Sequence, residues 1–144
     1  MNKEFIYNIY KRLKEEVPTL KWIDLNTNQL ESSTRPSVAY PCCLLDMEYV
    51  NCEALAGAKQ KVKIQFEFTV AIDSLGASTH AATPNDFLTE GFLKYDLLKE
   101  IHRALQWWNG DGLWMRLERR NIRKAKNNKS YESYKMIYQT DAID

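Results

Sequence analysis

The sequence is poor in the residues on which most recognisable protein chemistries depend. Its 144 residues include two histidines, three cysteines and five glycines. There is no Gly-rich phosphate loop of the G-x-G-x-x-G or G-x-x-x-x-G-K type and no G-x-S-x-G nucleophile elbow. The acidic residues show no paired spacing typical of general acid–base catalysis. We therefore expect a protein that is not an enzyme and needs no cofactor.

The cysteines and histidines are too few and too poorly spaced for a zinc site. Cys42 and Cys43 are adjacent, so they point to opposite faces of a strand, and no C-x-x-C pair exists. Three cysteines, with Cys52, also make a poor disulfide framework, so buried free thiols are expected. His102 is expected half exposed on the flank of a helix, and His80 in a polar loop. A Ser–His or Cys–His pair that meets only in the folded chain stays open.

The chain also lacks any apolar run near the roughly 20 residues that a membrane helix needs. Its N-terminal segment carries charges through its apolar pattern, unlike a signal peptide. With 44% hydrophobic and 27% charged residues, 144 residues are most simply one globular domain over 1–144. We expect a non-exported protein without membrane contact.

The apolar pattern predicts the element order helix, strand, strand, strand, helix, strand, strand. No strands alternate with parallel crossovers, so we predict an α+β fold: an antiparallel sheet of about four to five strands with two helices packed on one face. The predicted elements are a helix between Asn2 and Pro18, a short strand over 20–25, a strand over 35–50 whose proline-containing first half is an edge or a connection, a long strand over 61–73, a helix up to Trp108, and strands at 113–118 and 134–139.

Several connections are predicted as well. Residues 51–60 are expected to form a loop, 74–90 a long polar connection with a helix start at Thr83-Pro84, and 120–130 a polar hairpin tip. Gly91 is expected to break the second helix. Its core stripe is predicted to be Leu93, Leu97, Leu98, Ile101, Ala104, Leu105 and Trp108.

The stretch KVKIQFEFTVAID, from Lys61 to Asp73, is unusually long for a strand. Apolar residues alternate with polar ones throughout, and about 3.3 Å per residue gives it a span of roughly 40 Å. One hypothesis is that one end leaves the subunit and pairs or packs across subunits, with Lys63, Gln65 and Glu67 as candidate interface residues. The alternative is a long twisted central strand with one solvated face.

Charge is distributed unevenly along the chain. The net charge is +1, yet residues 116–129 carry seven basic side chains against Glu118 alone, so this window is +6 and the remainder −5. Such a hairpin can contact DNA phosphates or an acidic protein partner, or simply be a solvated loop. The candidate contact residues are Arg116, Arg119, Arg120, Arg123, Lys124, Lys126 and Lys129.

Three tryptophans cluster around the turn that follows the second helix. Trp108 falls on the core stripe, whereas Trp107 lies about 100° away on the helix and Trp114 is opposite Leu113 in the expected strand. Exposed tryptophans often anchor protein interfaces. Trp107 and Trp114 are therefore candidate subunit contacts, with core packing as the alternative.

The chain also resembles a known family over nearly its whole length. An N-terminal helix is followed by LKWIDLNTNQL (Leu20–Leu30), by VAYPCCLLDM (Val38–Met47), and then by a long alternating strand, a helix and a C-terminal hairpin. This order is similar to that of the tail terminator (tail completion) proteins of long-tailed bacteriophages, especially forms carried in Bacteroidetes prophages. The W-I-D…Q-L and P…L-D elements carry the likeness.

The resemblance implies a structural role. Such proteins form a ring, typically of six subunits, that caps the finished tail tube and offers a surface to the head–tail connector protein. The implied partners are other copies of the chain, the tail tube protein and the connector, and the implied locations are the host cytoplasm during assembly and then the virion tail. The basic hairpin would face the tube, the connector or DNA in the channel. A small nucleic-acid-binding module that uses the hairpin at 116–135 remains the alternative.

Overall fold

The structure is a computed structural model that describes residues 1–31, 36–73, 79–125 and 130–144. Predictions that fall on 32–35, 74–78 and 126–129 lie outside the described residues, and Lys126 and Lys129 are among them. Within the described ranges, no helix is both long and apolar enough to cross a membrane.

The first helix, α1 (Lys3–Glu16), begins and ends where its flanking residues predict. The Asn2 side chain accepts a hydrogen bond from the N–H of Glu4 at 3.0 Å, which satisfies one of the free amides of the first turn. Pro18 lies just beyond the last turn, and the face toward the sheet buries Phe5, Ile9 and Leu13. The predicted helix is therefore confirmed.

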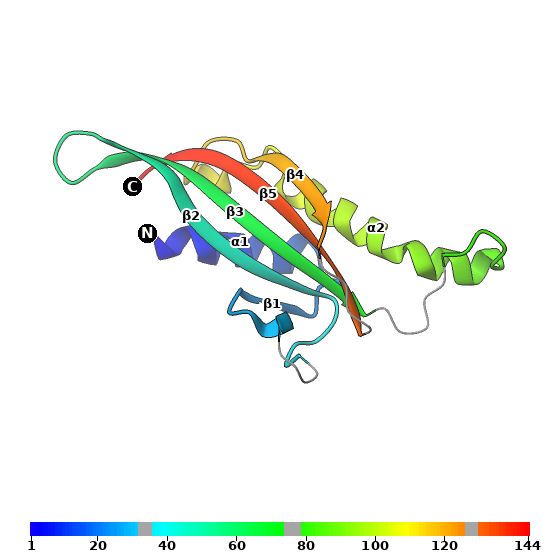
Figure 1. Ribbon diagram of the computed structural model, residues 1–144. Coiled ribbons are helices and arrows are strands. Elements are labelled where there is room, and N and C mark those ends of the chain that lie inside the picture. The colour runs from blue at the N-terminus through cyan, green and yellow to red at the C-terminus, as the bar shows by residue number, and fades with distance from the viewer. Residues whose placement is uncertain (32–35, 74–78, 126–129) are drawn as a thin grey trace.

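The described part of the chain forms a five-stranded sheet with the order β1-β2-β3-β5-β4 (Figure 1). The α+β class and the order of elements are as predicted. The sheet is mixed rather than purely antiparallel, because β1 runs parallel to β2. The strands are β1 (Trp22–Leu25), β2 (Cys42–Ala54), β3 (Gln60–Asp73), β4 (Glu118–Lys124) and β5 (Tyr131–Ile143).

The long alternating stretch is the central strand β3. Between Lys61 and Ala71 it is paired with β2 on one edge and with β5 on the other. Backbone pairing of residues 61–71 with another subunit is therefore ruled out, because both of their backbone edges are filled within one subunit, whereas packing across subunits stays a prediction. Its apolar residues Val62, Ile64, Phe66, Phe68 and Val70 are buried, as the alternation predicts.

The turn between β2 and β3 is shorter than predicted, and its strands are longer. β2 begins directly after Pro41, as the prolines indicate, and runs to Ala54, so the loop covers 55–59 rather than 51–60. Residues 50–59 are all exposed. We call them the β2–β3 arm, and Figure 1 shows the arm at one end of the molecule.

The second helix, α2 (Asn85–Leu105), is a single helix of 21 residues. The predicted start at Thr83-Pro84 is confirmed to within one residue, since Pro84 rather than Thr83 is the N-cap. The predicted break at Gly91 is wrong, because the helix continues through this buried glycine. A helical glycine costs only about 1 kcal/mol relative to alanine, which neighbouring turns can offset. The helix ends at Leu105, before the predicted Trp108.

The segment after α2 is irregular where a strand was expected at 113–118. Gly110–Gly112 forms a 3-10 turn, and Trp114 makes an isolated bridge with Ala142. β4 begins at Glu118 and ends at Lys124, so residues 120–124 of the predicted hairpin tip belong to a strand. Charged side chains are common on edge strands, so polarity alone does not distinguish an edge strand from a turn.

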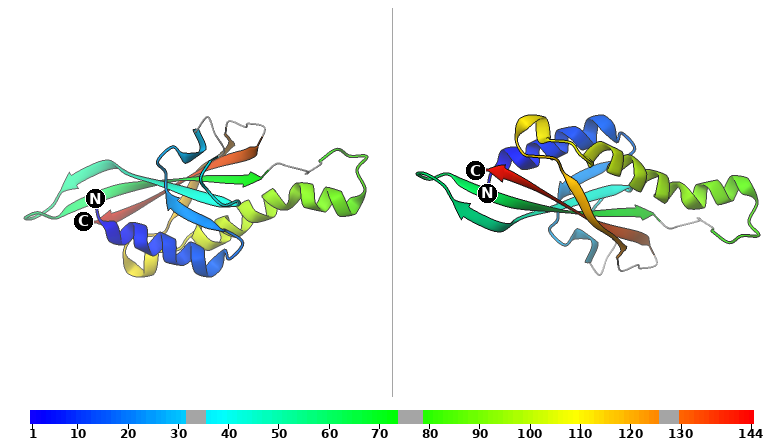
Figure 2. Two further views of the ribbon diagram at one scale, coloured as in Figure 1. Left: turned by 90° about the horizontal axis from the view of Figure 1, so that it is seen from below. Right: turned by 90° about the horizontal axis from the view of Figure 1, so that it is seen from above.

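Both α-helices cover one face of the sheet, as predicted, and the turn η1 (Gln29–Glu31) lies on the opposite face (Figure 2). The main core lies between the helices and the sheet. Beneath η1 there is a smaller buried cluster made of Leu30, Cys42, Leu44, Ala71 and Tyr131. The sheet therefore has a helix-covered face and a face that η1 covers at one end.

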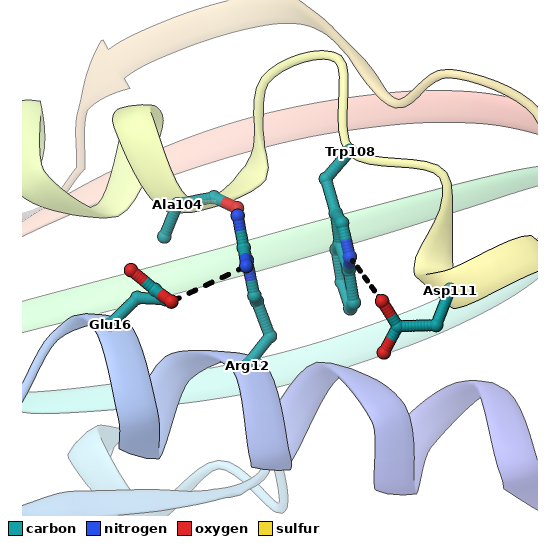
Figure 3. Close-up of polar contacts among 5 residues, drawn as sticks. All are labelled: Arg12, Glu16, Ala104, Trp108 and Asp111. Carbon is teal, nitrogen blue, oxygen red and sulfur yellow. Dashed lines mark hydrogen bonds and ion pairs between the residues drawn. The ribbon is translucent and has the colours of Figure 1, made fainter.

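Arg12 of α1 links this helix to the end of α2 (Figure 3). Arg12 Nε donates a hydrogen bond to the carbonyl oxygen of Ala104 at 2.9 Å, and the guanidinium lies 5.2 Å from the ring centre of Trp108. The same group pairs with Glu16 at 3.4 Å. The carbonyl groups of a last helical turn lack helical partners, so this contact also caps α2. The Trp108 indole donates to Asp111 at 3.4 Å and holds the following turn.

Candidate functional site

The structure divides the basic residues of β4 between two faces of the sheet. In the register with β5, Arg119 lies opposite Tyr138 on the helix-covered face, whereas Arg123 lies opposite Lys135 on the other face. Arg123 and Lys124 are exposed, and neither has an ion-pair partner within the described ranges. The predicted contact residues therefore do not form one continuous stripe.

The other basic residues near β4 interact within the subunit. The guanidinium of Arg116 lies 4.7 Å from the ring centre of Trp107, and Arg120 pairs with Glu118 at 3.2 Å. Trp107 is 58% exposed and has a positive φ of 67°. It therefore lies at the surface, where a contact with another subunit remains a prediction.

Trp114 does not lie at the surface, which corrects its assignment as a candidate subunit contact. Its ring is 5% exposed and packs edge-on against Phe5 and Trp108 and at a tilt against Phe66. The expected alternation of a strand at 113–118 placed it outward. The irregular turn after Gly110 points it into the core instead.

The three β3 candidates, Lys63, Gln65 and Glu67, are half-buried on the face opposite the helices, and each interacts with a neighbouring strand. Partly exposed ion pairs of this kind contribute only about 0–1 kcal/mol each to the stability of the fold. A role in subunit contact remains a prediction. Their partners are Asp141 for Lys63 (3.4 Å), Glu48 and Gln139 for Gln65 (3.0 and 2.8 Å), and Lys135 for Glu67 (3.3 Å).

A pocket of about 370 Å³ opens on this same face, between η1 and the β4–β5 pair. We call it the basic pocket, because three of its lining side chains are cationic and one, Glu31, is anionic. The Tyr131 hydroxyl donates to the carbonyl oxygen of Leu30 at 2.8 Å, which joins η1 to β5 on one side of the pocket. The lining residues are Asn26, Asn28, Leu30, Glu31, Thr69, Arg123, Lys124, Ala125, Tyr131, Ser133 and Lys135.

One row of residues crosses the sheet at this pocket. Thr69 of β3, Lys135 of β5 and Arg123 of β4 are successive partners in the strand registers, so they share a face. Thr69 is 5% exposed, and its Oγ1 has no hydrogen-bond partner among the described residues. Like charges directly opposite each other in a sheet are destabilising. Glu67 pairs with Lys135, and Arg123 is left uncompensated.

A second surface lies on the N-terminal half of α2, which projects beyond the end of the sheet (Figures 1 and 2). Four large apolar side chains are exposed there, which corrects the placement of Leu93 in the core stripe. Lys94 anchors the helix to Glu132 of β5 at 2.6 Å, and the buried stripe begins at Leu97. We call the exposed set the α2 patch: Phe87 (62%), Phe92 (41%), Leu93 (53%) and Tyr95 (51%).

Sequence reasoning missed the α2 patch although a signal was present. A helix that packs on one face shows one apolar stripe, whereas this helix carries Phe87, Phe92 and Tyr95 in addition to its buried stripe. The basic pocket had no comparable signal, because η1 and β4 are about 90 residues apart in the chain.

Among the other reactive groups, Cys42, Cys43 and Tyr138 are buried and His102 is half-buried, whereas Cys52 and His80 are exposed. The His102 Nδ1 and the Tyr138 hydroxyl form a hydrogen bond of 2.8 Å, and burial raises the pKa of Tyr138 to about 12. Burial also raises the pKa of the Cys42 thiol to about 11. Within the described ranges, no cluster of His, Cys, Asp and Glu is arranged to hold a metal ion.

No protein-family model matches this chain, and no curated protein matches it either.

Proposed function

We propose that this chain is a non-enzymatic assembly protein whose copies associate head to tail into a ring. The observation that carries the proposal is the position of its two projecting parts: the β2–β3 arm and the α2 patch lie at opposite ends of the molecule (Figure 1). Two different patches on one subunit make a heterologous contact, which generates a ring when the rotation closes. The occupant of the α2 patch is the arm of a second copy.

The chemistry of the two ends is complementary. The arm contributes exposed apolar groups at Val50 and Leu55 and carries Lys59 and Glu53, with Lys61 opposite Glu53 in the strand register. The first turns of α2 carry Asp86, Glu90 and Asp96 around the patch, while Lys94 is paired with Glu132. Apolar side chains at both ends, with Lys59 as a cation for these carboxylates, favour arm-to-patch contacts, and the like charges around the patch disfavour patch-to-patch contacts.

A ring of this kind is the structure that the resemblance to phage tail terminators implies. In this proposal the ring caps the tail tube protein and presents one face to the head–tail connector protein. It would assemble in the host cytoplasm and remain in the virion tail. The support is the α+β fold with the element order read from the sequence, together with the two ends described above.

A thiol cross-linking experiment tests the head-to-tail contact. The arm already carries the exposed Cys52. We expect a short bismaleimide to link wild-type protein to a Cys52→Ser, Asn85→Cys variant when the two are mixed, because one supplies the arm thiol and the other the patch thiol. Neither protein alone should cross-link. A variant that combines Cys52 with Asn85→Cys should give a ladder of products that stops at the ring size.

The matched control replaces Asn85→Cys with Met115→Cys, since Met115 is 67% exposed but lies outside both ends. Equal cross-linking of the control, or cross-linking of wild-type protein with itself, would contradict the head-to-tail contact.

The second candidate function is contact with DNA, and the exposed Arg123 and Lys124 favour it. Duplex binding should then weaken by about 0.9 log units of affinity per log unit of salt for each phosphate neutralised. A measured affinity that does not depend on salt would exclude this contact.

A further inference from the structure

We infer that the basic pocket is a binding site for a phosphate group carried by a small organic body, such as a mononucleotide. This site is separate from the two ends in the proposed ring contact. It lies on the sheet face opposite the helices, between η1 and the β4–β5 pair. Its volume of about 370 Å³ is within the range of small-molecule sites, which begins at about 300 Å³.

Three features of the pocket favour a phosphate ligand, and the first is its set of hydrogen-bond donors. Arg123 and Lys135 lie directly opposite each other, so their positive charges repel unless an anion lies between them. Glu67 pairs with Lys135 at 3.3 Å but is not part of the pocket lining, and Arg123 has no ion-pair partner within the described ranges. A phosphate accepts hydrogen bonds from both groups, and such charge-assisted bonds are about twice as strong as neutral ones.

The second feature is the buried hydroxyl of Thr69. A buried polar group without a partner costs about 1–3 kcal/mol, so natural structures rarely keep one without a reason. Thr69 lines the pocket, belongs to the same row as Lys135 and Arg123, and its Oγ1 lacks a partner among the described residues. An oxyanion held by the two cations supplies the missing acceptor.

The third feature is the size and lining of the pocket. A phosphate alone is much smaller than the space, and the lining also contains the apolar side chains of Leu30 and Ala125 and the side-chain amides of Asn26 and Asn28. These groups suit an organic body with hydrogen-bonding atoms. Glu31 also belongs to the lining and disfavours a second negative charge on its side.

The test measures binding of two probes, inorganic phosphate and adenosine monophosphate, by isothermal titration calorimetry. We expect both to bind and the nucleotide to bind more tightly, because the pocket holds more than the phosphate. Arg123→Met should weaken both affinities about tenfold or more, the equivalent of one charge-assisted hydrogen bond. The matched control is Arg120→Met, an arginine of the same strand that pairs with Glu118 and lies outside this pocket.

The variant Thr69→Val distinguishes a loss of phosphate binding from a loss of stability. Because Oγ1 has no partner among the described residues, its removal should leave the urea midpoint unchanged or raise it, while phosphate binding weakens. The proposal is overturned if neither probe binds, if Arg120→Met weakens binding as much as Arg123→Met, or if Thr69→Val leaves phosphate binding unchanged. Tighter binding of phosphate than of the nucleotide would show that free phosphate, and not a nucleotide, is the ligand.

Discussion

Replacing Gly110 with alanine should destabilise the protein more than the same change at Gly57. Both glycines have left-handed backbones, with φ of 62° at Gly110 and 69° at Gly57. An L-residue in this region costs roughly 1–2 kcal/mol, and this cost is common to the two variants. The difference in stability loss between the two variants therefore reports the packing around each added methyl group.

The surroundings of the two glycines differ strongly. A Cβ at Gly110 would lie 2.5–2.6 Å from three indole carbons of Trp114, whereas a Cβ at Gly57 meets nothing within 4 Å. Trp114 cannot easily retreat, because its ring centre lies 5.7 Å from that of Phe5 and 5.6 Å from that of Phe66. Overpacking of a core typically costs about 1–3 kcal/mol. We therefore expect losses of about 2–5 kcal/mol for Gly110→Ala and about 1–2 kcal/mol for Gly57→Ala.

Urea unfolding followed by tryptophan fluorescence measures both losses. Equal losses for the two variants would refute the reasoning, because they would show that the Trp114 ring does not pack against Gly110. A red-shifted emission of folded Gly110→Ala, relative to Gly57→Ala, would indicate in addition that Trp114 has been pushed toward solvent.

Two further predictions concern titratable groups. Burial, and secondarily Arg119, lowers the pKa of His102 below 6.5, so the unfolded chain binds the extra proton first. Stability should therefore fall as the pH drops through about 6.5 toward the folded pKa. His102→Asn should reduce this slope in urea midpoints, and an unchanged slope would contradict the assignment. Burial raises the pKa of Cys42 to about 11 and raises that of Cys43 further, whereas Cys52 is exposed. A thiol-reactive disulfide reagent should modify only Cys52 in the folded protein and all three cysteines in urea. Modification of Cys43 in the folded protein would contradict its buried position.

Periodicity predicted the elements whose burial alternates regularly. β3 and α1 followed from apolar spacing, because a strand or helix packed on one face repeats its burial every two or about 3.6 residues. β4 did not follow, because an edge strand of charged residues has almost no burial pattern. The parallel pairing of β1 with β2 was missed for a related reason: four residues carry too little pattern to show direction.

The candidate sites depended on contacts between distant segments. Trp107 was correctly placed at the surface, but Trp114 is buried because the turn at Gly110 rotates it inward. The basic pocket needs η1, β3 and the β4–β5 pair together, and no local pattern indicates that they meet. Charge counting identified Arg123 and Lys124, and only the strand register shows that Arg123 lies on the opposite face from Arg119.

The most direct test of head-to-tail association is the molar mass of the chain, measured by sedimentation velocity over a wide range of protein concentrations. We predict that the mass rises with concentration to one discrete plateau. Replacing Phe92 and Leu93 together with serine should keep the protein monomeric and folded, because both side chains are exposed in the subunit. Met115→Ser should still reach the plateau. A wild-type chain that stays monomeric at every concentration, or a Phe92/Leu93 variant that assembles like wild type, would contradict the account.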